Sequence, residues 1–146
     1  MTRTVPIAEG IIAMPDGDGS APRLLGGKCE ACGLVMFPRQ SSCARCSGLD
    51  VAETVLPSRG RLWAWTTQDF APPSPPYSGA AGDAFEPYGV GFVELPGVVR
   101  VESRLTVADP EVLHNGMEME LVLVPFRTND DGDTVVTFAF APVTAS

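Results

Sequence analysis

The amino-acid sequence predicts a mainly β protein, on the evidence of its turn-forming residues and its short strand-like segments. Its 146 residues include 15 glycines and 14 prolines, a content typical of many turns and not of a long-helix bundle or a coiled coil. From residue 59 onward, short aromatic and β-branched segments alternate with turn signals. A chain of this length buries a substantial core, as one compact domain or as two small modules.

The C-terminal part contains five strand-like segments of similar length: residues 60–70, 88–95, 99–105, 117–126 and 134–141. In segment 99–105 the apolar residues alternate with Arg100, Glu102 and Arg104, as expected of a strand with one face in the core. Asp109 and Pro110 predict the N-cap and first position of one helical turn between the third and fourth segments. Five strands with this short helix suit an OB-type Greek-key barrel better than an immunoglobulin-like sandwich, which has about seven strands.

Composition divides the chain into three predicted parts. Residues 1–22 are rich in Gly, Pro, Ala and Asp, and we expect an irregular arm with at most one short ordered piece at residues 7–14. Residues 23–57 hold every cysteine and form a small module, and residues 58–146 form the OB-fold domain. Within that domain a Pro-rich loop, residues 71–87, is too long for a tight hairpin.

Two Cys-x2-Cys pairs, separated by ten residues, have the spacing of a metal site: Cys29, Cys32, Cys43 and Cys46. Each pair turns two sulfurs toward a common point, and two such turns joined by a hairpin supply the tetrahedral S4 set of a closed structural zinc site. Gly33 directly follows the second cysteine and Gly48 lies two residues after the fourth, where glycine tolerates a positive φ. The pattern predicts a zinc ribbon over residues 23–57 with one structural zinc per chain.

Other interpretations of the cysteines are a mononuclear iron of the rubredoxin kind, two disulfides, or redox-active pairs. Disulfides fit less well, because Glu9, Gly10 and Pro15 interrupt the stretch where a secretory signal would have its apolar region. No apolar run reaches the ~20 residues of a membrane helix. We therefore expect a cytoplasmic protein with thiolate cysteines and no membrane partner.

The formal net charge of −8, from 10 basic and 18 acidic residues, argues against binding to a phosphate backbone. Residues suited to catalysis are also scarce. The single histidine, His114, precedes an Asn-Gly turn, and Glu118 and Glu120 share one face of a predicted strand, which is typical of a solvated surface. No nucleophile lies in a recognisable elbow, so we expect no catalytic residue in this chain.

Several short motifs follow one another in a fixed order along residues 24–126. They are Lys28-Cys-Glu-Ala-Cys-Gly33, Phe37-Pro38-Arg39, Cys43-Ala-Arg-Cys46, Ser58-Arg-Gly60, Leu62-Trp63-Ala64-Trp65-Thr66, Pro87-Tyr88 and Gly116-Met117. With these motifs the sequence resembles the rubredoxin-like zinc ribbon plus OB-fold proteins associated with acyl-CoA metabolism. It departs from that family in its Gly/Pro-rich arm, where members usually have an amphipathic helix, and in its extended Pro-rich loop.

The resemblance implies a non-catalytic accessory subunit. Members of that family pair with thiolases, hydroxymethylglutaryl-CoA synthases, or sterol-carrier-type thiolases and aldolases, including those of steroid side-chain and aromatic degradation. The expected partner is therefore a thiolase-like or sterol-carrier-type thiolase/aldolase large subunit, whose stability and site for a CoA thioester this chain would complete. The alternatives are a single-stranded nucleic-acid-binding zinc-ribbon/OB protein, which would need a basic track, and a free-standing hydrolase.

Four arginines on strands that adjoin in an OB barrel are candidates for the phosphates of CoA: Arg59, Arg61, Arg100 and Arg104. The alternative is ordinary surface arginines, some of them paired with Glu102. Four large apolar residues near the junction of ribbon and barrel are candidates for a partner interface: Met36, Phe37, Trp63 and Trp65. With period two, the tryptophans are expected on the same face of the first barrel strand.

Overall fold

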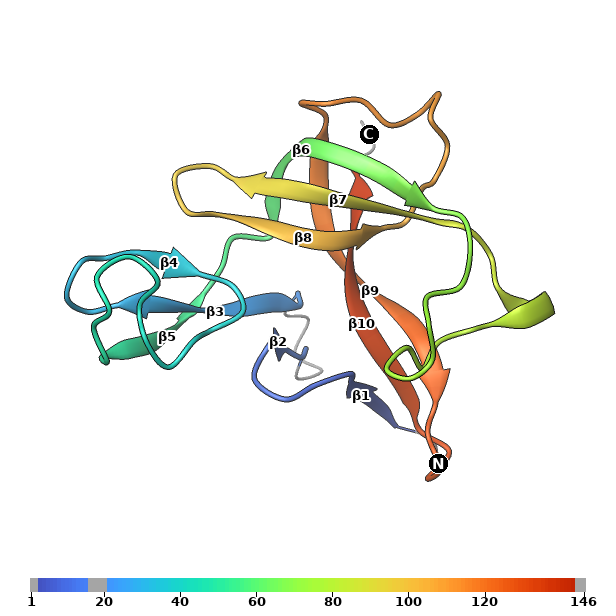
Figure 1. Ribbon diagram of the computed structural model, residues 1–146, viewed down its shortest axis with the longest axis horizontal. Coiled ribbons are helices and arrows are strands. Elements are labelled where there is room, and N and C mark those ends of the chain that lie inside the picture. Colours follow the sequence, from blue (N-terminus) through green and yellow to red (C-terminus); the bar gives the residue numbers. More distant parts are fainter. Residues whose placement is uncertain (1–2, 16–20, 144–146) are drawn as a thin grey trace.

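The C-terminal part of the chain forms a closed five-stranded barrel in the computed structural model, which describes residues 3–15 and 21–143. Its strands are β6 (Arg59–Gln68), β7 (Tyr88–Leu95), β8 (Val99–Leu105), β9 (Glu118–Thr128) and β10 (Thr134–Pro142). β6 pairs with β7 and β9, β7 pairs with β8, and β8 runs parallel to β10 (Figure 1). The antiparallel β9–β10 pair closes the barrel. This strand order confirms the predicted OB fold.

Alternation along the strands places one set of side chains inside the barrel. In β8, Val101, Ser103 and Leu105 are buried, whereas Arg100 and Glu102 are exposed. The buried hydroxyl of Ser103 donates a hydrogen bond to the backbone carbonyl of the next residue, at 2.8 Å, so it is not left without a partner. The period-two pattern predicted from the sequence is therefore confirmed in this strand.

The cysteine-containing module is a small antiparallel sheet. β3 (Arg23–Cys29) lies at its centre, with β4 (Val35–Met36) on one edge and β5 (Val51–Val55) on the other. The strands pack closely across a pair of glycines in β3. A Cβ atom on Gly26 would lie 2.7 Å from the carbonyl oxygen of Met36, and one on Gly27 would lie 2.7 Å from a methyl carbon of Val51. The centre of β3 therefore requires residues without a side chain.

The N-terminal arm contains two short strands, β1 (Thr4–Pro6) and β2 (Ile12–Ala13), in place of the single ordered piece expected at residues 7–14. β1 runs parallel to the first residues of β10, and β2 pairs antiparallel with β3. Strands of three and two residues are too short to show periodicity, so no sequence pattern indicated them. Residues 16–20, in the most Gly- and Asp-rich part of the predicted arm, lie outside the described residues.

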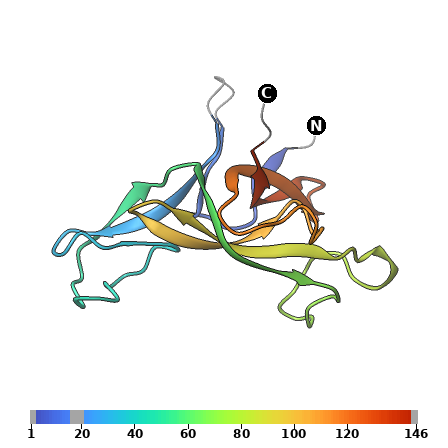
Figure 2. The ribbon, with the colours of Figure 1, turned by 90° about the horizontal axis from the view of Figure 1, so that it is seen from above.

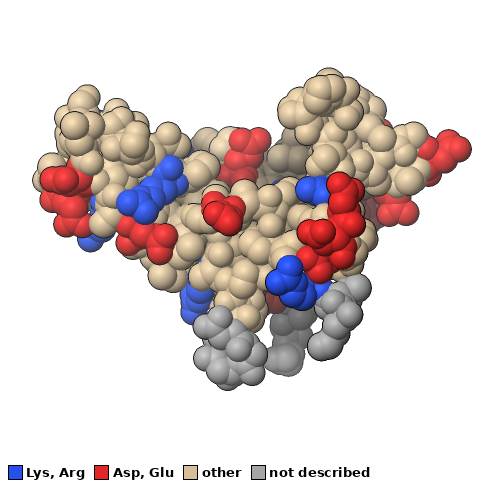
Figure 3. Space-filling model, turned by 90° about the horizontal axis from the view of Figure 1, so that it is seen from below, with Lys and Arg blue, Asp and Glu red and all other residues tan. Residues whose placement is uncertain are grey.

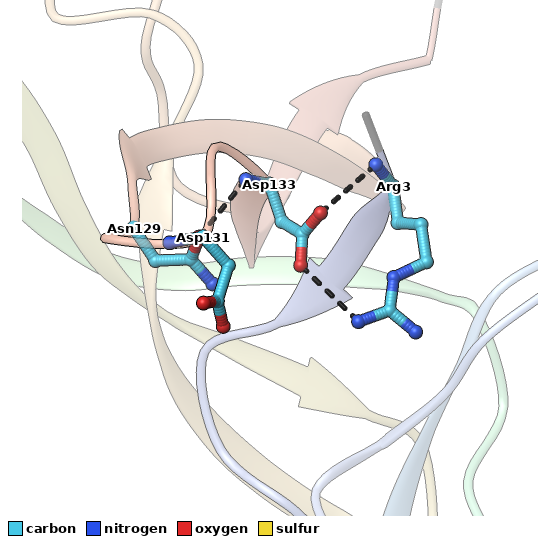
Figure 4. Close-up of polar contacts among 4 residues, drawn as sticks. All are labelled: Arg3, Asn129, Asp131 and Asp133. Atoms are coloured by element: carbon cyan, nitrogen blue, oxygen red, sulfur yellow. Dashed lines mark hydrogen bonds and ion pairs between the residues drawn. The ribbon is translucent and has the colours of Figure 1, made fainter. Parts of the chain in front are cut away.

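A buried carboxylate fastens the start of the arm to the β9–β10 hairpin (Figure 4). Asp133 accepts hydrogen bonds from the backbone N–H of Arg3, at 3.1 Å, and from its guanidinium, at 3.4 Å. The hairpin turn is itself held by Asn129, whose side-chain oxygen accepts from the backbone N–H groups of Asp131 and Asp133, at 3.0 and 2.9 Å. The turn at residues 129–133 thus also anchors β1.

The barrel and the base of the small sheet share one hydrophobic core. Leu24 of β3, Leu56 and Ile12 of β2 are buried in the same cluster as the inward-facing residues of the barrel. Phe37, which follows β4, packs its ring edge-on against Phe138 of β10, with ring centroids 5.5 Å apart. The small sheet is therefore docked on the barrel through apolar contacts.

The Pro-rich loop between β6 and β7 folds back on the barrel. It contains a single 3-10 turn, η1 (Gly82–Ala84). The Tyr77 ring packs edge-on against Phe126 of β9 at 6.0 Å, and its hydroxyl donates to the carbonyl of Ala80 at 3.0 Å. Figure 2 shows part of this loop and the cysteine-bearing loops projecting from the same side of the molecule, at its two ends.

The helical turn predicted after Asp109 is a hydrogen-bonded turn and not a helix. The side chain of Asp109 accepts from the backbone N–H of Glu111 at 2.9 Å, and its carbonyl accepts from Val112 and Leu113 at 3.0 and 3.1 Å. The turn stops there because Leu113 inserts into the barrel core. Within residues 3–15 and 21–143, no helix is long and apolar enough to cross a membrane.

Candidate functional site

The four cysteine sulfurs meet at one point between the loops of the small sheet. The Sγ atoms of Cys29 and Cys46 are 3.6 Å apart, those of Cys32 and Cys43 are 3.5 Å apart, and all four lie within 4.8 Å of one another. A tetrahedral zinc with Zn–S distances of ~2.3 Å places its sulfurs about 3.8 Å apart. The arrangement therefore fits a tetrahedral S4 metal site.

Each Cys-x2-Cys turn is closed by the residue after its second cysteine. The backbone N–H of Gly33 donates to the carbonyl of Cys29 at 2.9 Å, and that of Ser47 donates to the carbonyl of Cys43 at 2.9 Å. Both residues have a positive φ, 82° for Gly33 and 64° for Ser47. The prediction is confirmed for Gly33, whereas in the second turn a serine takes the strained position.

Gly48 has a different role from the one expected. It is not among the residues with positive φ. A Cβ atom at this position would lie 3.3 Å from the sulfur of Cys46 and 3.5 Å from that of Cys29. Glycine is therefore favoured here because a Cβ atom would crowd the sulfur of Cys46, and not because of the turn conformation.

Hydrogen-bond donors and neighbouring thiols set the charge of the sulfurs. The backbone N–H of Leu34 and then the Arg45 guanidinium lower the pKa of the Cys32 thiol to about 6. For Cys46 the backbone N–H of Gly48 lowers the pKa, but hydrogen bonding among the clustered sulfurs outweighs it and raises the pKa to about 12. Four thiolates this close repel one another, so at least one sulfur keeps its proton when no cation is bound. A divalent metal ion supplies the positive charge that allows all four to ionise.

These residues form the site of one structural zinc. Four thiolates complete a tetrahedral coordination shell, so no position remains for water or substrate. The site is small and lies at the surface: Cys29 and Cys43 are buried, Cys32 is half-buried and Cys46 is exposed. Bound zinc would crosslink the two turns and hold the small sheet together, which identifies the module as a zinc ribbon.

The first two arginine candidates lie side by side at the start of β6. Arg59 is 3.5 Å from the carboxylate of Glu120, and Arg61 is 3.8 Å from that of Glu118. Arg61 also donates to the carbonyl of Gly116 at 3.2 Å. Glu118 and Glu120 are thus partners of arginines on a solvated face, as their shared strand face indicated.

The other two arginine candidates lie on β8 and are engaged elsewhere. The guanidinium of Arg100 is 3.8 Å from the carboxylate of Glu94, and that of Arg104 lies 3.8 Å above the ring of Tyr88. Glu102 is not the partner of either one. The four arginines therefore form local pairs and stacks with different neighbours and not one shared cationic cluster.

The two tryptophans lie on opposite faces of β6, so the prediction that they share a face is wrong. Leu62 and Ala64 pair with consecutive residues of β7, which makes Trp63 the extra residue of a β-bulge. An inserted residue reverses the alternation after it. Trp65 consequently packs against the barrel core. The side chain of Trp63 points outward, and the residue is 49% exposed.

Two further interface candidates are engaged within the molecule. Met36 is buried in the ribbon core with Cys29, Cys43 and Val51. Phe37 is half-buried against Phe138, as described above. Of the four large apolar candidates, Trp63 is therefore the one with a largely exposed side chain.

Phe92 of β7 is an exposed aromatic residue that the sequence analysis did not single out. It is 41% exposed and its ring packs edge-on against Trp63 at 6.3 Å. The guanidinium of Arg100 lies 4.0 Å from the centroid of the Trp63 ring. Its outward orientation could have been inferred from the alternation of side chains along a strand. Phe92 has the same parity as Glu94 and the opposite parity from Val93 and Leu95.

His114 lies on the surface, in the turn before β9. Its side chain is exposed, and its Nδ1 atom is 3.4 Å from the carbonyl oxygen of Val112. It sits where the sequence placed it, in a solvent-exposed turn.

Two family models match consecutive parts of the chain. Residues 18–52 match the rubredoxin-like zinc ribbon domain of ChsH2, and residues 53–124 match its C-terminal OB-fold domain. Among solved structures, the chain is similar to one described as an Ltp2-ChsH2(DUF35) aldolase, with a TM-score of 0.58 and 23% identity over 84% of this chain and 86% of that one. That likeness supports the zinc ribbon and OB fold.

Curated proteins of similar length are also related. The benzoylsuccinyl-CoA thiolase subunit BbsA of Thauera aromatica is 32% identical over 86% of this chain and 81% of its own length. A DUF35 domain-containing scaffold protein of Pyrococcus furiosus is 31% identical over 85% of this chain and 86% of its own. The chain belongs to the ChsH2-type (DUF35) family of proteins with a rubredoxin-like zinc ribbon and a C-terminal OB fold.

Proposed function

We propose that this protein is a non-catalytic accessory subunit of a thiolase-like enzyme that cleaves or forms carbon–carbon bonds in CoA thioesters. One observation carries the proposal: the chain is 32% identical to a benzoylsuccinyl-CoA thiolase subunit over 81% of that subunit's length. The match includes both the ribbon and the barrel, so it applies to the whole two-part architecture. The large subunit would supply the nucleophile and the general base.

The metal site supports a role in binding and not in chemistry. A zinc held by four thiolates has no open position at which to polarise a thioester or to activate water. The four cysteines gather in one metal site and are not joined in disulfides, which fits a reducing compartment, and we propose a cytoplasmic location on this ground. The zinc then serves to keep the ribbon folded beside the barrel.

Arg59 and Arg61 are our candidates for contact with CoA phosphates. Together with Gly60, Pro96 and Glu118, the ion-pair partner of Arg61, they line a hollow of about 190 Å³ at the start of β6. Their side chains are 67% and 63% exposed, and their carboxylate partners are 3.5 and 3.8 Å away, so a phosphate can replace those partners at little cost. Arg100 and Arg104 are weaker candidates because both are stacked on aromatic rings.

Affinity purification tests the proposed function. The tagged chain, expressed in the cells it comes from, should retain a thiolase-family chain in a near-equimolar amount, identified by mass spectrometry and intact-complex mass. Replacing Arg59 and Arg61 together by alanine should leave that complex intact and weaken its affinity for CoA. Recovery of the tagged chain without any thiolase-family protein, together with salt-dependent binding to single-stranded oligonucleotides, would contradict the proposal.

A further inference from the structure

The outer face of β6, β7 and β8 is hollowed. Two neighbouring hollows, of about 210 and 370 Å³, both include Phe92 and Glu102 in their walls. Ala64 and Val90 line the first, and Ile11 and Phe37 line the second. We call this surface the outer groove. Its floor is mostly apolar, and it extends from the middle of the barrel to the ribbon.

Two projecting parts of the molecule flank this face. Figure 2 shows the loops of the ribbon and the Pro-rich loop extending past β6 on the same side, one at each end of the sheet. In the space-filling view from below, a notch separates the two lobes, with the ribbon on the left (Figure 3). The outer face of the sheet therefore lies at the base of a concave surface, where a partner would be contacted from three sides.

Exposed aromatic side chains lie beside the charged residues of this face. Trp63 and Phe92 are 49% and 41% exposed and pack edge-on against each other. Arg100 is held between the Trp63 ring and the carboxylate of Glu94. Glu102, which is exposed and borders both hollows, takes part in no ion pair within the described part of the chain. Of the charged residues that line the two hollows, Arg100 pairs with Glu94 and Glu102 has no partner among the described residues, so the charge left for a ligand in the hollows is negative. Arg104 lies outside both hollows, stacked on Tyr88.

We infer that the outer groove is the docking site for a segment of the partner subunit that presents a lysine or arginine between apolar side chains. The apolar side chains would fill the two hollows on either side of Phe92, and the cation would pair with Glu102 between them. Aromatic anchors next to a desolvated charge pair are typical of the residues that dominate binding energy at protein interfaces. The inference rests on the proposed function, because it takes the thiolase-like subunit as the partner.

The same charges disfavour a nucleic acid in the groove. Single-stranded nucleic acids are bound by aromatic stacking together with a track of free cationic side chains. Here Arg100 and Arg104 are both stacked on rings of this chain, and Glu102 would repel a phosphate. An apolar, basic protein segment satisfies both the hollows and the unpaired carboxylate.

Two substitutions in the tagged full chain test the inference, each with a matched control. Phe92→Ser and Glu102→Lys should each reduce the amount of thiolase-like subunit retained by at least about tenfold. Val112→Ser changes a residue of similar exposure, 43%, outside the groove, and Glu53→Lys makes the same charge change on β5 of the ribbon. Both controls should retain the subunit within about twofold of the unmodified chain. Zinc content and melting temperature, measured for all four variants, identify any that fail to fold.

A photo-crosslinking amino acid at position 92 provides an independent readout that does not need a loss of binding. In the assembled complex it should crosslink to a peptide of the thiolase-like subunit that contains a lysine or arginine among apolar residues, whereas the same probe at position 112 should not. An unmodified chain that retains no thiolase-like subunit would mean that the proposed function itself is wrong.

Three results would overturn the inference. If the complex forms but both groove variants retain the subunit, or position 92 yields no crosslink, the docking site lies elsewhere and the proposed function stands. If the groove instead binds single-stranded oligonucleotides and Phe92→Ser abolishes that binding, the occupant is a nucleic acid. Retention that survives Glu102→Lys but not Phe92→Ser would exclude the cationic partner.

Discussion

The ribbon and the barrel of this protein are stabilised in different ways. The ribbon's own cluster of buried residues has four members, Cys29, Met36, Cys43 and Val51, and two of these are metal ligands. Among the residues that the structure describes, the barrel cluster has twelve, all of them apolar and contributed by strands and connecting segments from both ends of the chain. Modules as small as the ribbon usually need a metal or disulfides because they bury too little apolar surface. The ribbon therefore depends on zinc, whereas the barrel depends on packing.

The change from one kind of stabilisation to the other occurs within β3 and not at the link to the barrel. Leu24, near the start of β3, is fully buried in the barrel cluster, whereas Cys29, at its end, belongs to the ribbon cluster. The glycine pair between them allows β4 and β5 to approach closely. Loss of zinc should therefore unfold the outer part of the ribbon while β3 remains attached to the barrel at its base.

The largest effect is expected from removing a zinc ligand. Cys43→Ser should lower the zinc content from about one per chain to near zero, because structural zinc in small modules contributes about 10–16 kcal/mol of binding energy. Amide hydrogen exchange should then lose protection in residues 29–51 and keep it in the barrel. Ser42→Ala, an exposed neighbour, is the control and should keep its zinc. Global unfolding of Cys43→Ser would show that the barrel also depends on the metal.

Truncation of a large side chain in the barrel core should destabilise the barrel and leave the zinc site intact. Phe140 is fully buried, and Phe140→Ala should lower the free energy of unfolding by about 3–5 kcal/mol. Urea unfolding followed by tryptophan fluorescence measures this change, and the folded protein should still contain one zinc. A loss of zinc from the folded variant would contradict independent stabilisation of the two regions.

Leu24 tests where the boundary between the two regions lies. Leu24→Ala should cost about 2–5 kcal/mol of unfolding free energy and lower the stability of the barrel, although the residue precedes the barrel in sequence. Leu49→Ala is the control within the ribbon, since Leu49 is 80% exposed, and it should change the stability by less than about 0.5 kcal/mol. Equal, small effects of both substitutions would place the boundary at the ribbon–barrel link instead.

The smallest effect is expected where the arm meets the β9–β10 hairpin. Arg3→Ala should cost less than about 1 kcal/mol, because the Arg3 side chain is 76% exposed and its backbone N–H still donates to Asp133. Asp133→Ala should cost more, about 1–3 kcal/mol, because it removes the acceptor of that backbone group. Thermal unfolding of both variants measures the difference. Equal costs would mean that the side-chain ion pair, and not the backbone contact, holds the arm.

The barrel strands and the zinc ligands were predictable from the sequence because each has a regular spacing. Period-two alternation over 99–105 and the paired Cys-x2-Cys turns depend on local geometry alone. The β-bulge at Trp63 was not predictable, because an extra residue leaves no mark in a run of aromatic and β-branched residues. The extra residue puts the side chains of the two tryptophans on opposite faces of β6. Trp63 therefore packs against Phe92 on the outer face of the barrel.

Other features depend on contacts between distant parts of the chain. β1 and β2 are ordered by pairing with β10 and β3, and neither strand has a periodic pattern of its own. The partners of the arginines also depend on register: Arg59 and Arg61 face β9 because β6 pairs with it there, whereas the sequence suggested Glu102 as a partner. The outer groove, for the same reason, becomes visible only once the strands are assembled.

Reconstitution of activity tests the central claim, that this chain is an accessory subunit, most directly. The thiolase-like subunit and this chain would be purified separately and assayed alone and together for carbon–carbon bond cleavage in a panel of CoA thioesters. The mixture should be at least about tenfold more active than the large subunit alone, and this chain alone should have no activity. Activity of this chain by itself, or a large subunit whose activity and stability do not change when this chain is added, would contradict the claim.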